Sequence, residues 1–449
     1  MKKIDLDKHL KISLKRERKR LRRLRIGKSY SSHFSLKKRL HEYLIQHDKK
    51  IIQHTLFGLS DFLFTSDFCD HKFENSFVKI PDKFCLQTDY DKTITVIKKI
   101  VGNLRTIDLN TLLLDFSKCT KVDFTALFLL NVIIYEHFEF YKKLNIKLRI
   151  LDITPKIKVT KSKNNEVNIQ LLLSGYIKEA EGKDTDHIPI STTGLIKGNK
   201  TRKHYLENTK GIVATNIVEY VNECLKQHEY EINPEGKNNL GGIISEVLNN
   251  AEDHSPFNTW YAFASFLQVN KRDDSALVGE LNLSFLNFGY TIFQGFEDTK
   301  NENKLVYTEM DKLHAFIQNK YKSNPFTKEN LFTLYALQDG FSRIKFESIS
   351  RGTGTMKFLN SFMTFGDYED LALGFSPCLS ITSGQTKITT DIKNKPFKKD
   401  DLYFISLNEE NDLLILPDKT HLEQKNDFFP GTILSVKIYI NKEHLRNKK

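Results

Sequence analysis

The sequence predicts an α/β protein in which a basic helical segment precedes two globular domains. An apolar run at 112–116, an apolar helical stretch at 124–141 and an alternating stretch at 146–151 indicate a strand, a crossover helix and a second strand. Such a unit pairs its strands in parallel. A second series of helices and strands follows from about 205 to 440. At 449 residues the chain is also longer than one hydrophobic core usually serves.

These patterns divide the chain into five expected parts. A polar stretch at 184–200, rich in hydroxyl side chains and glycine, indicates a linker or a lead-in strand between the two domains. The expected parts are a basic helical region at 1–70, a first α/β domain at 73–182, a linker at 183–204, a second α/β domain at 205–441 and a basic tail at 442–449.

The composition predicts a cytoplasmic protein with reduced cysteines. Hydrophobic residues make up 39% of the chain, and 33 Phe and 17 Tyr supply enough large side chains for globular cores. No apolar run reaches the roughly 18 residues that suggest a membrane span, and the first residues lack the apolar core of a signal peptide. The five cysteines are far apart and form no Cys-x-x-Cys pair, so we expect neither a disulfide framework nor a zinc site.

Residues 11–28 concentrate the positive charge of the chain. Ten basic residues and one acidic residue there account for nine of the twelve net positive charges. Leu14, Leu21 and Leu24 interrupt the run, a pattern that fits a basic helix. A segment of this charge attracts polyanions by counterion release, so nucleic acid is one expected partner. The alternative is a solvated tail, or a helix docked on an acidic partner surface.

The centre of the first domain carries a recognisable segment. Residues 112–127 read Leu-Leu-Leu-Asp-Phe-Ser-Lys-Cys-Thr-Lys-Val-Asp-Phe-Thr-Ala-Leu, and a closing helix expected at 169–177 ends at Gly175. The segment resembles the middle of a STAS domain, the small α/β fold of anti-sigma-factor antagonists and sulfate-transporter tails. In those antagonists a strand leads to Asp-Ser-Ser-Gly-Leu at a helix start, and the second Ser accepts a phosphate.

The matching stretch here is Asp123-Phe124-Thr125-Ala126-Leu127. The resemblance makes Thr125 the candidate phosphoacceptor, although Phe replaces one Ser and Ala replaces Gly. The alternative is that the Thr125 hydroxyl caps the backbone N–H groups at the start of the helix. The resemblance also implies that the first domain binds a protein partner.

Four short motifs follow one another in the second domain. The first lies on a helix expected at 239–253, and the second ends a strand expected at 276–286. The third precedes a helix expected at 356–363, and the fourth opens a strand expected at 432–440. The motifs are Glu246-Val247-Leu248-Asn249-Asn250-Ala251, Asn287-Phe288-Gly289, Arg351-Gly352-Thr353-Gly354-Thr355 and Pro430-Gly431-Thr432.

The residue types in these motifs suit a phosphorylated ligand with a metal ion. Glu246 and Asn250 are four residues apart and therefore lie on neighbouring parts of one helix face. Mg²⁺ prefers oxygen ligands and keeps most of its waters, so one amide oxygen together with phosphates makes a normal site. Gly352 and Gly354 allow the backbone to approach phosphates at a helix N-terminus, where free N–H groups are available. Arg351 adds a charge-assisted contact.

In this order the motifs resemble the nucleotide site of the GHKL ATPases, the family of gyrases, heat-shock chaperones, sensor histidine kinases and mismatch-repair ATPases. The resemblance implies a Bergerat-type α/β two-layer sandwich, with one mixed sheet and helices on one face. It implies ATP and Mg²⁺ as ligands, Asn250 as the magnesium ligand and Glu246 as the catalytic general base. The nucleotide-binding residues that it implies are Asn250, Asn287, Gly289, Arg351, Gly352, Gly354, Thr355 and Thr432.

The chain departs from the family motif Asp-x-Gly-x-Gly at two positions. Asn287 replaces the Asp that accepts the adenine amino group, and Thr291 replaces the second Gly. Asn287 can still accept a hydrogen bond through its side-chain carbonyl. The segment between the second and third motifs corresponds to the ATP lid, and helical patterns at 310–321 and 328–338 predict that this lid is ordered.

Three functions are open at this point. The first is an ATP-binding switch with slow hydrolysis that controls partner binding. The second is an anti-sigma-type Ser/Thr protein kinase that acts on a STAS partner, which resembles known pairings in bacterial regulators. The third is a non-catalytic interaction or nucleic-acid-binding module on a degenerate ATPase fold. A homodimer is an arrangement that the sequence leaves open for each of them.

Overall fold

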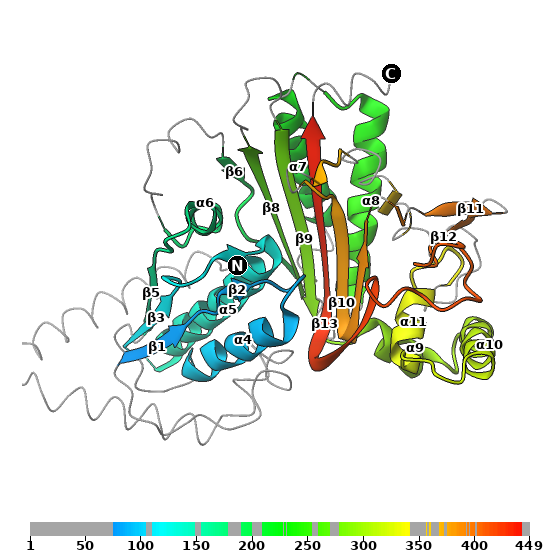
Figure 1. Ribbon diagram of the computed structural model, residues 1–449. Helices are drawn as coiled ribbons and strands as arrows, with labels where there is room; N and C mark the ends of the chain where they lie inside the picture. The colour runs from blue at the N-terminus through cyan, green and yellow to red at the C-terminus, as the bar shows by residue number, and fades with distance from the viewer. Residues whose placement is uncertain are drawn as a thin grey trace, which may run out of the picture.

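The computed structural model describes residues 75–104, 110–148, 154–177, 190–199, 209–227, 229, 231–253, 259–269, 278–341, 356, 359–360, 368–371, 375–391, 393–394, 396–399 and 402–441. The basic region expected at 1–70 and the tail expected at 442–449 lie outside these residues. Within them the chain is an α/β protein, as predicted (Figure 1). We call residues 75–177 the first lobe and residues 190–441 the second lobe.

The first lobe contains a small parallel sheet. Strands β1, β3 and β5 pair in that order, and both pairings are parallel, which confirms the predicted strand–helix–strand unit. The apolar sides of β1 and β3 pack against helices α4 and α5 in one hydrophobic cluster. The elements are β1 (Asn75–Lys79), β2 (Lys83–Phe84), α4 (Tyr90–Leu104), β3 (Thr111–Asp115), β4 (Lys121–Val122), α5 (Phe124–Leu148), β5 (Lys156–Thr160) and α6 (Asn165–Leu173).

The second strand of this unit lies later in the chain than the sequence indicated. A strand was expected at 146–151, but helix α5 continues to Leu148 and the strand is β5, Lys156–Thr160. Neither Gly nor Pro interrupts residues 124–148, so nothing in the sequence stops the helix there. Pro155 directly precedes the strand. The expected closing helix is α6, and Gly175 follows it with a positive φ of 76°.

The second lobe is built on a six-stranded sheet. Its main path has the order β10-β13-β9-β8-β6, and β7 also pairs with β8. The segment expected as a linker or lead-in strand therefore supplies β6 and β7. The elements are β6 (Ile190–Thr192), β7 (Ile196–Asn199), α7 (Thr209–Lys226), α8 (Pro234–Asp253), β8 (Thr259–Val269), β9 (Val278–Phe288), α9 (Ile292–Thr299), α10 (Lys304–Lys320), α11 (Lys328–Tyr335), β10 (Cys378–Thr390), β11 (Phe397–Lys399), β12 (Leu402–Phe404) and β13 (Leu422–Asn441).

Every strand pairing in the described part of this sheet is antiparallel. The expectation of a mixed sheet was therefore wrong for these strands. The reason is that β13 lies between β9 and β10. These two strands run in the same direction, but each pairs with β13 and not with the other. β8 and β9 are consecutive and pair directly, as neighbouring strands usually do.

Both faces of the large sheet are covered (Figure 1). Helices α7 and α8 pack on one face, which we call the helix face, where Leu283, Phe285 and Leu434 join their hydrophobic cluster. The first lobe packs on the other face, which we call the docking face, and Phe263 and Phe288 join its cluster. Helices were expected on one face only, and the structure shows that α4 and α5 of the first lobe cover the second face.

Helix α5 lies between the small sheet and the large sheet. Its residues from Phe124 to Leu130 are all buried, so no side of its first two turns faces water. A helix that is apolar all round is buried on all sides, and here two sheets provide that cover. In the described part of the chain, no helix is long and apolar enough to cross a membrane. The cysteines at 85, 119, 224 and 378 are free, as predicted.

Glycine is required at position 431, where the backbone of β13 lies against the Asn287 carbonyl of β9. Its φ is 132°, and an added Cβ would lie 2.1 Å from the Asn287 carbonyl oxygen. We expect Gly431→Ala to lower the free energy of unfolding by about 2 kcal/mol or more, measured by urea denaturation. Gly102→Ala is the matched control, because an added Cβ in helix α4 meets nothing within 4 Å. It should be neutral or stabilise by about 0.5–1 kcal/mol. Equal effects of the two changes would contradict the close-contact explanation.

His137 makes the stability depend on pH. It is buried in α5, its ring lies 4.6 Å from that of Tyr141, and burial lowers its pKa to about 3. An unfolded histidine has a pKa near 6.5, so the unfolded chain gains this proton first as the pH falls. We expect the imidazole to cost about 2 kcal/mol of stability between pH 7 and pH 5. The free energy of unfolding, measured by urea denaturation, should fall between pH 7 and pH 5 by about 2 kcal/mol less in His137→Phe than in the native chain. An unchanged loss would contradict the assignment.

Candidate functional site

Three neighbouring strands bring polar side chains together at one end of the helix face. Asn287 of β9 is the register partner of Thr432 of β13, and Thr432 is the register partner of Ser383 of β10. Side chains alternate along a strand, so Asn287 points to the same face as Phe285, which packs against α7 and α8. We call Asn287, Thr432 and Ser383 the polar row. It joins two residues that the sequence singled out with one that it did not.

Ser383 fixes the geometry of the row. The Ile292 backbone N–H donates to its Oγ at 2.9 Å, and its own hydroxyl donates to the Gly431 carbonyl at 3.1 Å. The Thr432 Oγ1 lies 3.0 Å from the Ser383 Oγ. Because the single Ser383 proton is used by Gly431, the Thr432 hydroxyl is the donor in that contact. The Thr432 oxygen can therefore still act as an acceptor.

Asn287 holds an unused hydrogen-bond donor. Its side chain is 4% exposed, and its Nδ2 has no hydrogen-bond partner among the described residues. A buried donor without a partner costs about 1–3 kcal/mol, so an isolated one needs an explanation. A ligand acceptor at this point would satisfy it. Gly289 follows with a φ of 133°, and its N–H donates to the Pro430 carbonyl at 3.2 Å.

Helix α8 places Glu246 and Asn250 beside the helix face of the sheet. Ile244 and Leu248 are buried against the sheet, whereas Glu246 and Asn250 are half-buried on a flank of the helix. Ser245 lies on the flank of α8 that faces α7. Successive residues of a helix are 100° apart, so Glu246 and Asn250 lie on a different flank. The pair therefore faces away from α7.

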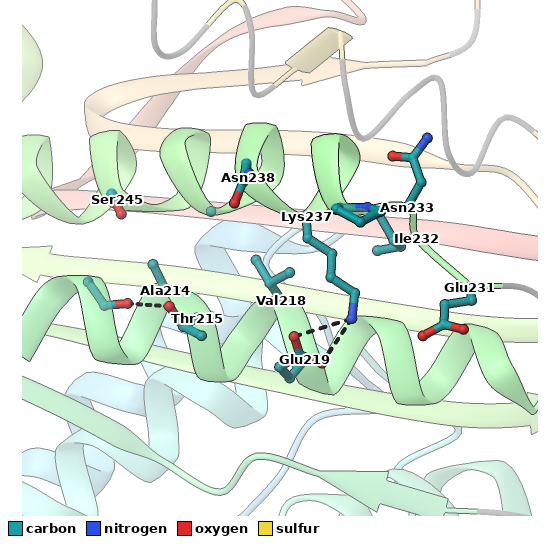
Figure 2. Close-up of a pocket in the computed structure, with 13 residues that line it drawn as sticks. Ala214, Thr215, Val218, Glu219, Glu231, Ile232, Asn233, Lys237, Asn238 and Ser245 are labelled. Carbon is teal, nitrogen blue, oxygen red and sulfur yellow. Dashed lines mark hydrogen bonds and ion pairs between the residues drawn. The ribbon is translucent and has the colours of Figure 1, made fainter.

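The flank toward α7 borders a different feature. A groove of about 810 Å³ runs between α7 and α8, with Ala214 and Val218 at its apolar floor (Figure 2). Lys237 and Glu219 form an ion pair of 3.3 Å across it. No motif residue lines this groove. It is separate from the polar row.

Helices α9 and α11 contact the strands that carry Thr432 and Ser383 of the polar row. Thr291 is the N-cap of α9 and forms a capping box with Gln294, which is a structural reason for a threonine at this position. The Glu329 carboxylate of α11 accepts the Gln385 backbone N–H at 2.8 Å, and burial raises the pKa of Glu329. The helices expected at 310–321 and 328–338 are present as α10 and α11.

Glu329 passes directly over a glycine next to the polar row. An added Cβ on Gly384 would lie 1.9 Å from the Glu329 Oε1 and 3.2 Å from a methyl carbon of Thr291. Gly384 has a positive φ of 60° and lies at a bulge in β10. The absence of a side chain at Gly384 therefore lets Glu329 of α11 lie close to the polar row.

The third motif lies outside the described residues. Arg351, Gly352, Gly354 and Thr355 belong to it. Of the helix expected at 356–363, the structure describes Met356, Leu359 and Asn360, and both Met356 and Leu359 are buried in the cluster on the helix face. In the described part of the chain, no group of three or more His, Cys, Asp and Glu side chains is placed to hold a metal ion.

Thr125 lies under the large sheet. It is buried in the first turn of α5, with 4% exposed surface. The Asp123 carboxylate caps the start of this helix, since it accepts the Ala126 N–H at 2.6 Å, and it also accepts the Gln87 N–H at 2.9 Å. Burial raises the pKa of Asp123, and these two bonds oppose the shift. A kinase could reach Thr125 only after the two lobes separated.

Four residues near this site were not singled out from the sequence: Gln294, Glu329, Ser383 and Gly384. Thr291 and Gln294 match a capping box that the sequence displays, so the α9 start was detectable. Gly384 interrupts a strand pattern, which indicates a bulge. Neither Ser383 nor Glu329 carries a signal of its own, because the first depends on strand pairing and the second on how α11 packs.

Three comparisons bear on this geometry. No family model matches the chain, no curated protein matches it, and no solved structure matches it.

The Ser383 hydroxyl should contribute measurably to stability. Ser383→Ala leaves the Ile292 N–H and the Gly431 carbonyl without their buried partner. We expect the free energy of unfolding to fall by about 1–3 kcal/mol, measured by urea denaturation. Thr95→Ala on the exposed side of α4 removes a hydroxyl that donates to the Asp91 carbonyl of its own helix, and it should change stability by less than about 0.5 kcal/mol. Similar losses in both variants would contradict the central role of Ser383.

Proposed function

We propose that this chain binds ATP with Mg²⁺ between helix α8 and the polar row, on a second lobe of the GHKL type. The unpartnered donor of Asn287 is the observation that supports this proposal most directly. A buried amide with a free N–H and a carbonyl presents one donor and one acceptor. The edge of adenine presents the complementary pair, and asparagine is a common bidentate partner of adenine. Asn287 thus suits adenine in its own way, where the family has a carboxylate.

Thr432 supports the same placement. It is next to Asn287 across the ladder, and its oxygen can act as an acceptor because the single proton of Ser383 is used by the Gly431 carbonyl. A base held at the row would meet both side chains. Thr291, the N-cap of α9, and Glu329 of α11 would border the bound base on the side of the proposed lid.

The phosphates would then lie toward helix α8. Asn250 offers an amide oxygen, and Mg²⁺ bound through one protein oxygen and the phosphates needs no larger protein cage. The metal ion supplies charge neutralisation to the phosphates when it is bound. Glu246, one turn before Asn250, is placed to orient water and accept its proton as general base. Arg351, Gly352, Gly354 and Thr355 would contact the phosphates from the third motif.

The activity that fits this residue set is slow ATP hydrolysis that switches partner binding. The retained carboxylate at Glu246 favours hydrolysis over binding alone. The burial of Thr125 weighs against phosphate transfer within one chain. A STAS-like first lobe would be the element that binds the protein partner, and the basic segment at 11–28 would bind nucleic acid in the non-catalytic alternative.

The switch proposal predicts separate effects for the two α8 side chains. We expect Glu246→Ala to bind ATP but to release phosphate at least about 100-fold more slowly, because the general base is removed. We expect Asn250→Ala to lose the Mg²⁺-dependent part of its ATP affinity. Phosphate release and calorimetric ATP binding, each with and without Mg²⁺, measure both effects.

Asn249→Ala is the matched control, because Asn249 is the neighbouring amide on the same helix and points about 100° away. It should behave as the native chain. Label from γ-phosphate on the protein instead of free phosphate would favour the kinase alternative. A native chain that binds no ATP would overturn the proposal and favour the interaction-module alternative.

A further inference from the structure

The first lobe contacts each of the three strands that carry the polar row. On β9, Phe288 directly follows Asn287 and packs in the cluster with the first lobe. On β13, Asp427 lies five residues before Thr432, and it pairs with Lys98 of α4 and accepts the Tyr90 hydroxyl through its carbonyl at 3.1 Å. We call these contacts anchors.

The third anchor is on β10. Lys387 lies four residues after Ser383, and its ammonium donates to the Gln87 carbonyl of the first lobe and to Glu423 at 2.7 Å. Burial lowers the pKa of Lys387, and the contact with Glu423 opposes this shift. Cys378, at the start of the same strand, lies 3.7 Å from the Gln87 side-chain oxygen.

Aromatic packing holds the middle of the interface. The ring of Phe263 stacks on Phe124 at 5.0 Å and on Phe128 at 6.2 Å. On the docking face, Phe288 and Phe429 stack at 6.2 Å. Aromatic pairs of this kind add to the hydrophobic burial and favour the docked arrangement.

A polar cavity shows that the interface is not packed throughout. It has a volume of about 150 Å³ and lies between the start of α5 and the docking face. Thr125 and Asp123 line it from the first lobe, and Glu280, Asn282 and Lys437 line it from the sheet. Buried polar groups around a gap are costly, so the lobes can loosen here at a lower cost than in an all-apolar interface.

We infer that the docked first lobe regulates the nucleotide site through the opposite faces of β9, β13 and β10. The inference rests on the proposed function, because it names the regulation of the same site. The docked lobe holds Asn287, Thr432 and Ser383 in register, so ATP binds more tightly to the docked form. Binding linkage is reciprocal. ATP therefore favours the docked arrangement of the first lobe over the undocked one by the same factor. A signal that loosens the first lobe weakens ATP binding without touching the nucleotide.

Charge reversal at one anchor tests this coupling in the full chain. Lys98→Glu opposes Asp427 and should increase hydrogen exchange in α4 and in the first turns of α5. It should also raise the ATP dissociation constant by about threefold or more. The double variant Lys98→Glu with Asp427→Lys restores an ion pair and should return both values toward the native ones. In the native chain, ATP should slow exchange in the same segments.

Lys92→Glu is the matched control. Lys92 lies on the same helix, its side chain is 74% exposed, and it pairs with the nearby Asp89 of the first lobe and not with the large sheet as described. It should leave exchange and ATP affinity unchanged. Phe263→Leu is a second way to loosen the dock, since it removes the stack on Phe124 and lies on a strand without a row residue.

The outcomes separate this inference from the proposed function. Faster exchange with unchanged ATP affinity in Lys98→Glu would overturn the coupling and leave ATP binding in place. Unchanged exchange in both Lys98→Glu and Phe263→Leu would overturn the claim that these contacts hold the dock. A native chain without ATP binding would overturn the proposed function and the coupling together. Loss of affinity that the double variant rescues supports the coupling.

Discussion

The ladder between β9 and β13 determines the positions of most other parts of the molecule. It runs from Phe288 opposite Gly431 to Val278 opposite Asn441, and along this ladder both strands are largely buried on both faces. Since side chains alternate, a slip of one residue would point Asn287 at the first lobe and Phe288 at α8. Gly431 prevents such a slip, because only a residue without Cβ can pass the Asn287 carbonyl. One backbone register thus positions the polar row and the aromatic interface together.

Burial on both faces also explains the character of the central strands. A sheet with one solvated face shows clear alternation between apolar and polar residues. β9 instead places polar Asn282 and Ser284 on the docking face, where they bond to Glu280 and Ser435 inside the protein. These side chains look solvent-facing in the sequence, yet they are buried among polar groups of the second lobe. The apparent outer face of the strand is an internal surface.

The sequence predicted elements whose signals are local. The α5 helix, the β3 strand and the α8 stripe each follow from residue spacing, and the parallel pairing of β3 with β5 follows from the crossover helix. The end of α5 was misplaced because the short alternation at 146–151 looked like a strand. Ser383 and Glu329 could not be found, since they reach Thr432 and Gly384 only through pairings between distant segments. No local sequence pattern indicated that the first lobe packs on the large sheet either.

The contacts between the lobes limit how the chain can be divided. Residues 190–441 on their own would expose Tyr261, Phe263, Leu286, Phe288, Phe429 and Ile433, which now share one cluster with the first lobe. A continuous apolar surface of this kind invites aggregation. The two lobes are therefore not exchangeable modules, and neither could be transferred to another protein by recombination without a substitute for its neighbour. Changes at the interface must come in matched pairs, so the two lobes are expected to diverge together.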